Sequence, residues 1–175
     1  MVGEIRDVDT VQIATQASLT GHLVFSTLHT NDAASAVTRL MEIGIEPYLV
    51  ASSVVGVMAQ RLVRRVCSQC KQPYAPDDEQ WRRLGFDTNG TDLSQVAEGV
   101  GCEACRQTGY RGRIGLFELM LVDEALRGLI QDREPAGNIK STAVKTGMRT
   151  LRADGLAKIL QGQTTASEVV RVTVR

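Results

Sequence analysis

The chain has 175 residues, enough to bury the core of one domain or of a compact pair of domains. Lysine plus arginine equals aspartate plus glutamate, at 20 each, so the chain lacks the positive excess that is typical of general nucleic-acid binding. No apolar run reaches the roughly 18 to 20 residues that span a bilayer, and the N-terminus is too charged for a secretory signal. We therefore expect a cytoplasmic protein.

The first 26 residues follow the pattern of strand, helix and strand. Ile5 ends a short candidate strand, and Asp7 is placed to cap a helix whose apolar residues recur at helical spacing over residues 8–17. Residues 23–26 form a short apolar run with β-branched and aromatic character, which predicts a buried strand.

A second helix and a third follow this run. Asn31 or Asp32 is placed to cap the second helix, which Gly44 is placed to end. The small residues that follow Pro47 predict a further short helix. Strands that alternate with helices over so short a distance indicate an α/β layer with a mostly parallel sheet.

Residues 58–66 and 113–120 have the composition of two strands, and all four cysteines lie between them. We predict that the two segments pair as a long hairpin with the cysteine-bearing segment inserted at its tip. The last third of the chain has helical patterns instead. Asp123 is placed to cap one helix, Pro135 suits the first turn of another, and residues 151–160 form a third amphipathic stretch. Residues 165–168 have the spacing of a capping box.

The cysteines form two tight pairs, Cys67-x-x-Cys70 and Cys102-x-x-Cys105, separated by 31 residues. Two residues between cysteines allow both sulfurs to face one ion, and two such pairs complete a tetrahedral thiolate site without an open position. This pattern predicts a structural zinc ion in preference to four free cysteines or a redox pair. The central gap is longer than in the usual nucleic-acid-binding ribbon.

Basic residues crowd the first cysteine pair, namely Arg61, Arg64, Arg65 and Lys71. Three interpretations of them remain open. They could bind phosphate, they could meet carboxylates on a neighbouring subunit, or they could form an ordinary solvated face.

Several strings in the chain resemble the secretion ATPases that power type II secretion and type IV pili. Residues 3–7 (GEIRD) resemble the Walker B region of that family, and residues 20–30 (TGHLVFSTLHT) resemble its histidine box. Residues 59–65, 109–115 and 147–152 and the paired cysteines are similar to the same family. Residues 19–22 together with residues 44–47 are most similar to its type II secretion members.

The resemblance implies the C-terminal part of a RecA-like P-loop ATPase core, an α/β fold, with an inserted four-cysteine zinc module and a C-terminal helical region. It divides the chain into four segments. Residues 1–66 would form the C-terminal half of the ATPase core, 67–111 the zinc module, 112–122 a strand that returns to the core, and 123–175 the helical region.

The resemblance also implies roles for individual residues. Glu4 matches the Walker B glutamate, which polarises the water that attacks the γ-phosphate. His29 is placed to sense the γ-phosphate or a neighbouring subunit, and Arg6 and Asp7 belong to the same polar network. His22 precedes His29 by seven residues, which span on the order of 20 Å when extended. We therefore expect His22 to act in coupling or packing.

The chain departs from the family in one respect that decides activity, because it contains no G-x-x-x-x-G-K-[ST] phosphate loop. We expect the sequence to be truncated at its N-terminus and, by itself, neither to bind ATP tightly nor to hydrolyse it. The full-length protein would use ATP and Mg²⁺.

The resemblance implies further that the full-length protein is a hexamer, cytoplasmic and peripheral on the inner membrane through inner-membrane components of the type II secretion system. No nucleic-acid partner is expected. A pilus-assembly ATPase of the same family, a zinc-dependent nucleic-acid-binding module and a zinc-dependent docking adaptor are the alternatives.

Overall fold

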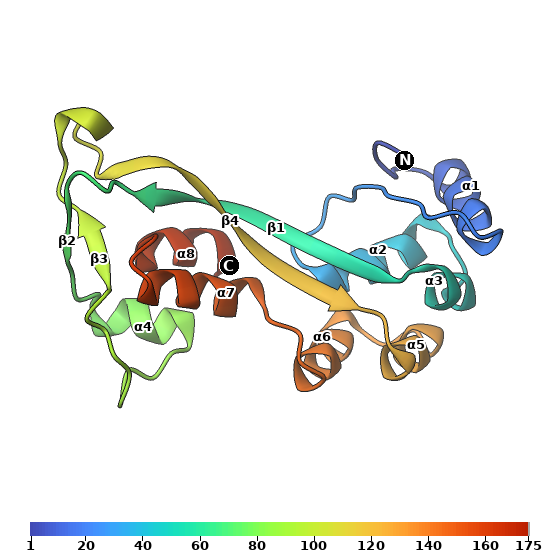
Figure 1. Ribbon diagram of the computed structural model, residues 1–175. Coiled ribbons are helices and arrows are strands. Elements are labelled where there is room, and N and C mark those ends of the chain that lie inside the picture. The colour runs from blue at the N-terminus through green and yellow to red at the C-terminus, as the bar shows by residue number, and fades with distance from the viewer. Residues whose placement is uncertain (175) are drawn as a thin grey trace. The chain divides into compact units, whose positions relative to one another are not determined.

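A computed structural model describes residues 1–174 of the chain (Figure 1). The chain divides into two compact units. Unit 1 contains Met1–Ala59 and Glu118–Arg149, and unit 2 contains Gln60–Phe117 and the described residues from Thr150 onward. The α/β class predicted from the sequence is confirmed. The predicted four-segment division of the chain stays a prediction.

Unit 1 consists mainly of helices packed around an aliphatic core. Its buried residues include Val37, Val50, Met120, Leu126 and Ile139, so both stretches of the chain in this unit supply the core. Almost all of the core is Val, Leu, Ile, Ala and Met, as the low aromatic content requires. The helices are α1 (Val8–Leu19), α2 (Ala33–Ile43), α3 (Pro47–Ser53), α5 (Glu124–Gln131) and α6 (Ala136–Lys145).

Side-chain caps set the starts of three of these helices. The carboxylates of Asp7, Asp32 and Asp123 accept hydrogen bonds from backbone N–H groups in the first turns of α1, α2 and α5, at 2.8–2.9 Å. Gly44 ends α2 in the left-handed region, at φ 119°. The four predicted helix boundaries are therefore confirmed. Pro135 precedes the first residue of α6, one position before the predicted first turn.

The predicted buried strand over residues 23–26 is wrong. The segment is extended but forms no regular strand, and the side chains of Leu23 and Phe25 are 75% and 64% exposed. The N-terminal segment donates two backbone hydrogen bonds to this part of the chain, from Val2 N to Phe25 O at 2.9 Å and from Ile5 N to Thr27 O, one residue beyond the predicted strand, at 3.1 Å. Two bonds are too few for a ladder. The predicted strand at Ile5 is absent for the same reason.

A long two-stranded hairpin is formed by β1 (Gly56–Val66) and β4 (Tyr110–Leu121). Figure 1 shows the two strands running in opposite directions, with the cysteine-bearing segment at their tip. The predicted hairpin and the inserted module are therefore confirmed. Along the second half of β4 buried and exposed residues alternate, as expected of a strand with one covered face.

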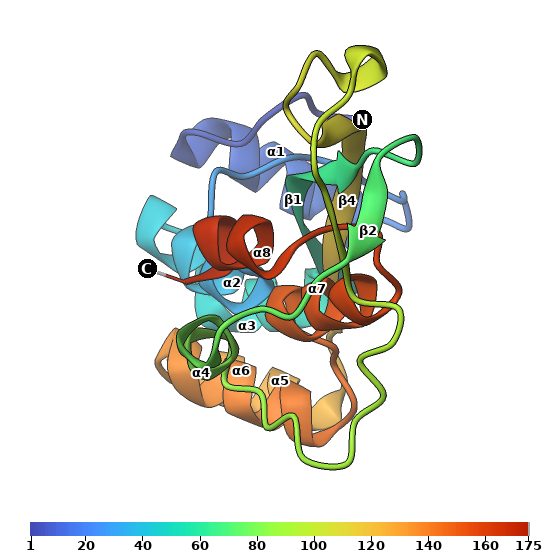
Figure 2. The same cartoon turned by 90° about the vertical axis from the view of Figure 1, so that its left-hand side faces the viewer.

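Unit 2 contains the inserted segment and the last two helices. A second small sheet pairs β2 (Lys71–Pro73) with β3 (Ala97–Gly99), antiparallel. The other elements are α4 (Asp78–Leu84), the 3₁₀ turn η1 (Glu103–Cys105), α7 (Leu151–Leu160) and α8 (Ala166–Thr173). Both α4 and α7 pack against α8, and Figure 2 shows α7 and α8 side by side, as Figure 1 does.

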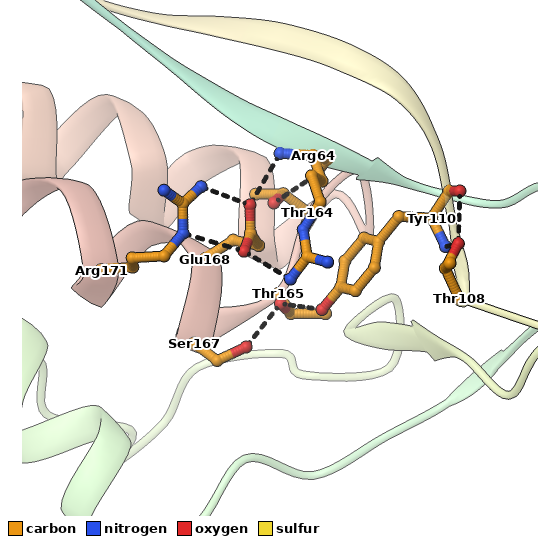
Figure 3. Close-up of polar contacts among 8 residues, drawn as sticks. All are labelled: Arg64, Thr108, Tyr110, Thr164, Thr165, Ser167, Glu168 and Arg171. Carbon is orange, nitrogen blue, oxygen red and sulfur yellow. Dashed lines mark hydrogen bonds and ion pairs between the residues drawn. The ribbon is translucent and has the colours of Figure 1, made fainter.

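The predicted capping box at the start of α8 is also wrong. Thr165 occupies the cap position but makes no capping hydrogen bond, and its hydroxyl lies 2.9 Å from the Tyr110 hydroxyl instead. The Glu168 carboxylate accepts hydrogen bonds from the backbone N–H and the guanidinium of Arg64, both at 2.8 Å, and from Arg171 (Figure 3). Two charged donors outcompete one neutral backbone group for this carboxylate.

Candidate functional site

Glu4, Arg6 and His29 form one polar cluster in unit 1. His29 Nε2 lies 2.9 Å from Glu4 Oε1, and Arg6 Nη2 lies 2.6 Å from Glu4 Oε2. The Glu4 side chain is 22% exposed, whereas the two basic side chains are largely exposed. One half-buried carboxylate is therefore held between two solvent-facing basic groups that come from different parts of the sequence.

Backbone contacts between two extended segments bring this cluster together. In addition to the bond from Ile5 N to Thr27 O, the Thr27 hydroxyl donates to the carbonyl oxygen of Gly3 at 2.7 Å. Both contacts flank Glu4, so the carboxylate is anchored on either side. His29 follows Thr27 by two residues on the opposite segment. The Walker B-like string and the histidine-box-like string are therefore adjacent.

The cluster favours the ionised form of Glu4. The hydrogen bond from Arg6 is the largest effect and lowers the pKa of the Glu4 carboxyl. Partial burial opposes this shift, and the charges of Arg6 and His29 reinforce it. An ionised carboxylate at this position can accept a proton or orient a water molecule at neutral pH.

The other two residues expected in this network make different contacts. Asp7 uses its carboxylate to cap α1 at Thr10. His22 Nδ1 lies 3.3 Å from the Thr20 hydroxyl in the turn that follows α1. The sequence-based grouping therefore combines a three-residue cluster with two residues whose described contacts are local.

The four cysteine sulfurs gather at the tip of the hairpin in unit 2. All lie within 4.8 Å of one another, and the pairs Cys67–Cys102 and Cys70–Cys105 are 3.9 and 3.8 Å apart. A tetrahedral zinc site with Zn–S bonds of about 2.3 Å requires sulfurs roughly 3.8 Å apart. The spacing therefore fits a four-thiolate metal site.

Backbone N–H groups favour a thiolate at Cys105. The N–H groups of Cys102 and Gly109 donate to Cys105 Sγ at 3.2 and 3.3 Å. Burial alone would raise the pKa of this thiol, but these hydrogen bonds, with those of the Cys102 and Cys70 side chains, lower it to about 6. The thiolate is the form that binds metal.

Two glycines, Gly99 in β3 and Gly109 just before β4, allow the backbone beside the cysteines to approach closely, and no sequence motif indicated this contact. A Cβ atom on Gly99 would lie 2.0 Å from the carbonyl oxygen of Gly109, and one on Gly109 would lie 2.2 Å from that of Gly99. The same Gly109 carbonyl accepts a hydrogen bond from Cys67 N at 2.9 Å. In the sequence, the one indication of this close packing was that both glycines lie near the second cysteine pair.

Comparison with known proteins identifies the family of the chain. The family described as Type II/IV secretion system protein matches residues 1–171. The chain therefore belongs to the type II/IV secretion system protein family, as its strings predicted.

Individual relatives come from both branches of this family. The chain is 53% identical over 173 residues to the type II secretion system ATPase E of Vibrio cholerae. It is 52% identical over 174 residues to the type IV pilus assembly ATPase PilB of Thermus thermophilus. Both matches cover 99% of this chain, but only 34% and 20% of the relatives, so the chain spans a fifth to a third of their length.

Solved structures support the same fold. The pilus retraction motor PilT with bound ADP matches 99% of this chain and 40% of its own with a TM-score of 0.65 at 22% identity. The Legionella pneumophila ATPase DotB matches 97% of this chain and 36% of its own with a TM-score of 0.63 at 21% identity. Among residues 1–174 no helix has the length and apolarity needed to cross a membrane.

Proposed function

We propose that this chain is the hydrolytic edge of a hexameric ATPase that powers export through the type II secretion system. The observation that carries the proposal is the contact of Glu4 with both His29 and Arg6. In this proposal Glu4 polarises the attacking water, and His29 senses the γ-phosphate or a neighbouring subunit. Arg6 belongs to the polar network around Glu4, Asp7 supports that network from the cap of α1, and His22 acts in coupling or packing.

ATP with Mg²⁺ would supply the phosphoryl group at this edge, and this chain's residues would act on the water. Ionised Glu4 is a better proton acceptor when His29 and Arg6 turn toward phosphate oxygens and leave its carboxylate for the water. Both basic side chains are solvent-exposed, so they have room to turn. The chain has no phosphate loop of its own, and we propose that alone it does not hydrolyse ATP.

The cysteine cluster would hold a structural zinc ion. Four thiolates leave no open position for a substrate, which argues for a role in folding and docking. Metal binding of this kind contributes on the order of 10 kcal/mol to folding, because the site does not exist in the unfolded chain. This would stabilise a segment with few other buried apolar residues.

The proposed partners and cellular location are those that the resemblance to the family implies. The longer protein would be cytoplasmic and bound at the inner membrane through components of the type II secretion system. Sequence identity alone does not separate a role in type II secretion from one in pilus assembly, since the chain is 53% identical to the type II secretion ATPase and 52% identical to the pilus ATPase named above. The type II choice depends on residues 19–22 and 44–47.

A nucleic-acid-binding function is disfavoured by the contacts of Arg64. This residue was one of the four candidate phosphate ligands, but its guanidinium contacts buried Glu168 and stacks on the Tyr110 ring at 4.1 Å. A guanidinium used in this way is a poor phosphate ligand. The neutral net charge agrees with this interpretation.

The test is a chimera in which this chain replaces the matching third of the Vibrio cholerae ATPase. We expect the chimera to hydrolyse ATP and Glu4→Gln to lower the turnover rate about 10² to 10⁴-fold. The control is Glu42→Gln, because the ion pair that Glu42 forms with Arg39 in the same unit is exposed to solvent. An active chimera that keeps its full rate with Glu4→Gln would contradict the proposal.

A further inference from the structure

A buried carboxylate lies at the start of α2 in unit 1, and no function has been assigned to it so far. Glu118, from β4, is 1% exposed, and its Oε1 accepts a hydrogen bond from the backbone N–H of Ala33 at 2.9 Å. Its Oε2 lies 3.9 Å from Lys140 Nζ of α6. Lys140 in turn donates to Asp32 Oδ2 at 2.7 Å.

Three side chains stabilise the first turn of α2. Asp32 caps the helix through Ser35, Glu118 binds the first helical N–H group, and Lys140 links the two carboxylates. Burying a carboxylate is costly unless donors compensate it, and the N-terminus of a helix supplies such donors and a favourable dipole. Ala33 is fully buried, so this start of the helix has little freedom to move.

The clamped turn lies immediately after the histidine of the candidate site. Only three residues, 30–32, separate His29 from Ala33, and the Thr30 hydroxyl donates to the Asp32 carbonyl at 3.2 Å within this connection. The four Cα–Cα steps from His29 to Ala33 span roughly 14 Å at most when extended. The location of the first turn of α2 therefore limits where the His29 imidazole can be.

We propose that Glu118 and Lys140 are positioning residues that hold His29 against Glu4 by fixing the start of α2. Through Lys140, helix α6 acts on the Glu4–His29 contact. The mechanistic value of this positioning rests on the proposed function, but the geometric claim can be tested without ATP. Glu118 is 85 residues from Ala33 in the sequence, and Lys140 is 108 residues from Asp32. No local motif therefore indicates these contacts.

The chain has only two histidines, which makes the test direct: in ¹H–¹³C spectra the Cε1–H group gives one signal for His29 and one for His22. The Glu4→Ala variant shows how far the His29 signal shifts when the contact between the imidazole and the Glu4 carboxylate is lost. We expect Lys140→Met and Glu118→Gln to shift the His29 signal in the same direction and to leave the His22 signal in place. On a Glu4→Ala background, Lys140→Met should produce no further shift.

Two controls separate positioning from general loss of structure. Lys145→Met removes an exposed lysine from the same helix and should leave both signals unchanged. Lys140→Arg keeps the charge and should retain the wild-type His29 signal. If Glu118→Gln does not fold, the Lys140 variants decide alone.

A His29 signal that is unmoved in folded Lys140→Met would overturn the inference, as would an equal shift in Lys145→Met or Lys140→Arg. Loss of turnover in the Glu4→Gln chimera tests the proposed function separately. Either idea can therefore fail while the other stands.

Discussion

Replacing Glu168 with glutamine should remove a large part of the stability of unit 2. The Glu168 side chain is 2% exposed and accepts four hydrogen bonds from Arg64 and Arg171, at 2.8–3.1 Å (Figure 3). Burial opposes ionisation, but the hydrogen bonds from Arg171 and Arg64 lower the pKa of Glu168 from 4.5 to about 2. A shift of this size corresponds to about 3 kcal/mol of folding free energy at pH 7.

The dependence on pH has a defined sign. Because the folded-state pKa is below the unfolded-state value, the contribution is fully present above about pH 4.5 and is lost as the pH falls from 4.5 towards 2. The destabilisation caused by Glu168→Gln should therefore be about 3 kcal/mol at pH 7 and should shrink below pH 4.5. Metal release at low pH affects both proteins and cancels in the difference.

Urea unfolding followed by the fluorescence of Trp81 measures this difference. Trp81 is the single tryptophan, is 5% exposed and lies on α4, which packs against α8. Glu79→Gln is the matched control, because the same chemical change at an exposed position in the first turn of α4 should cost at most about 1 kcal/mol. A loss below about 1 kcal/mol at pH 7, or one independent of pH, would refute the reasoning.

Three further results are expected. Cys105→Ser should lower the zinc content, measured by mass spectrometry, from one ion per chain towards zero, and unchanged content would exclude the four-sulfur site. Gly109→Ala should destabilise unit 2 far more than Gly112→Ala in urea unfolding. Both glycines have positive φ, at 74° and 79°, but a Cβ on Gly112 would have no atom within 4 Å, whereas one on Gly109 would clash with Gly99. Equal losses would mean that strain at positive φ, not the clash with Gly99, decides. Asp123→Ala should cost about 1 kcal/mol by removing the cap of α5, seen in thermal unfolding by circular dichroism, and no loss would show that the cap is dispensable.

Local signals in the sequence predicted much of the fold. The caps at Asp7, Asp32 and Asp123 were recognisable because a cap and the N–H group that it binds are three residues apart. The hairpin could be inferred because its two strands have similar composition and flank the cysteine pairs. The spacing of the cysteines likewise indicated one shared site.

Signals that depend on distant partners were missed or misinterpreted. Thr165 and Glu168 have the spacing of a capping box, but Arg64, 104 residues away, binds the carboxylate instead. Residues 23–26 have the apolar composition of a buried strand, yet burial depends on neighbouring strands and not on the segment itself. Glu118 gave no signal, because an isolated glutamate in a strand is usually a surface residue.

Single-turnover hydrolysis of radiolabelled ATP by the chimera tests most directly whether this chain supplies the hydrolytic carboxylate. We expect Glu4→Gln to bind ATP as tightly as the unmodified chimera and to slow the chemical step at least about 100-fold. If ATP binding and the rate of phosphate cleavage were both unchanged, Glu4 would not act on the attacking water, and the assignment of this edge would be contradicted.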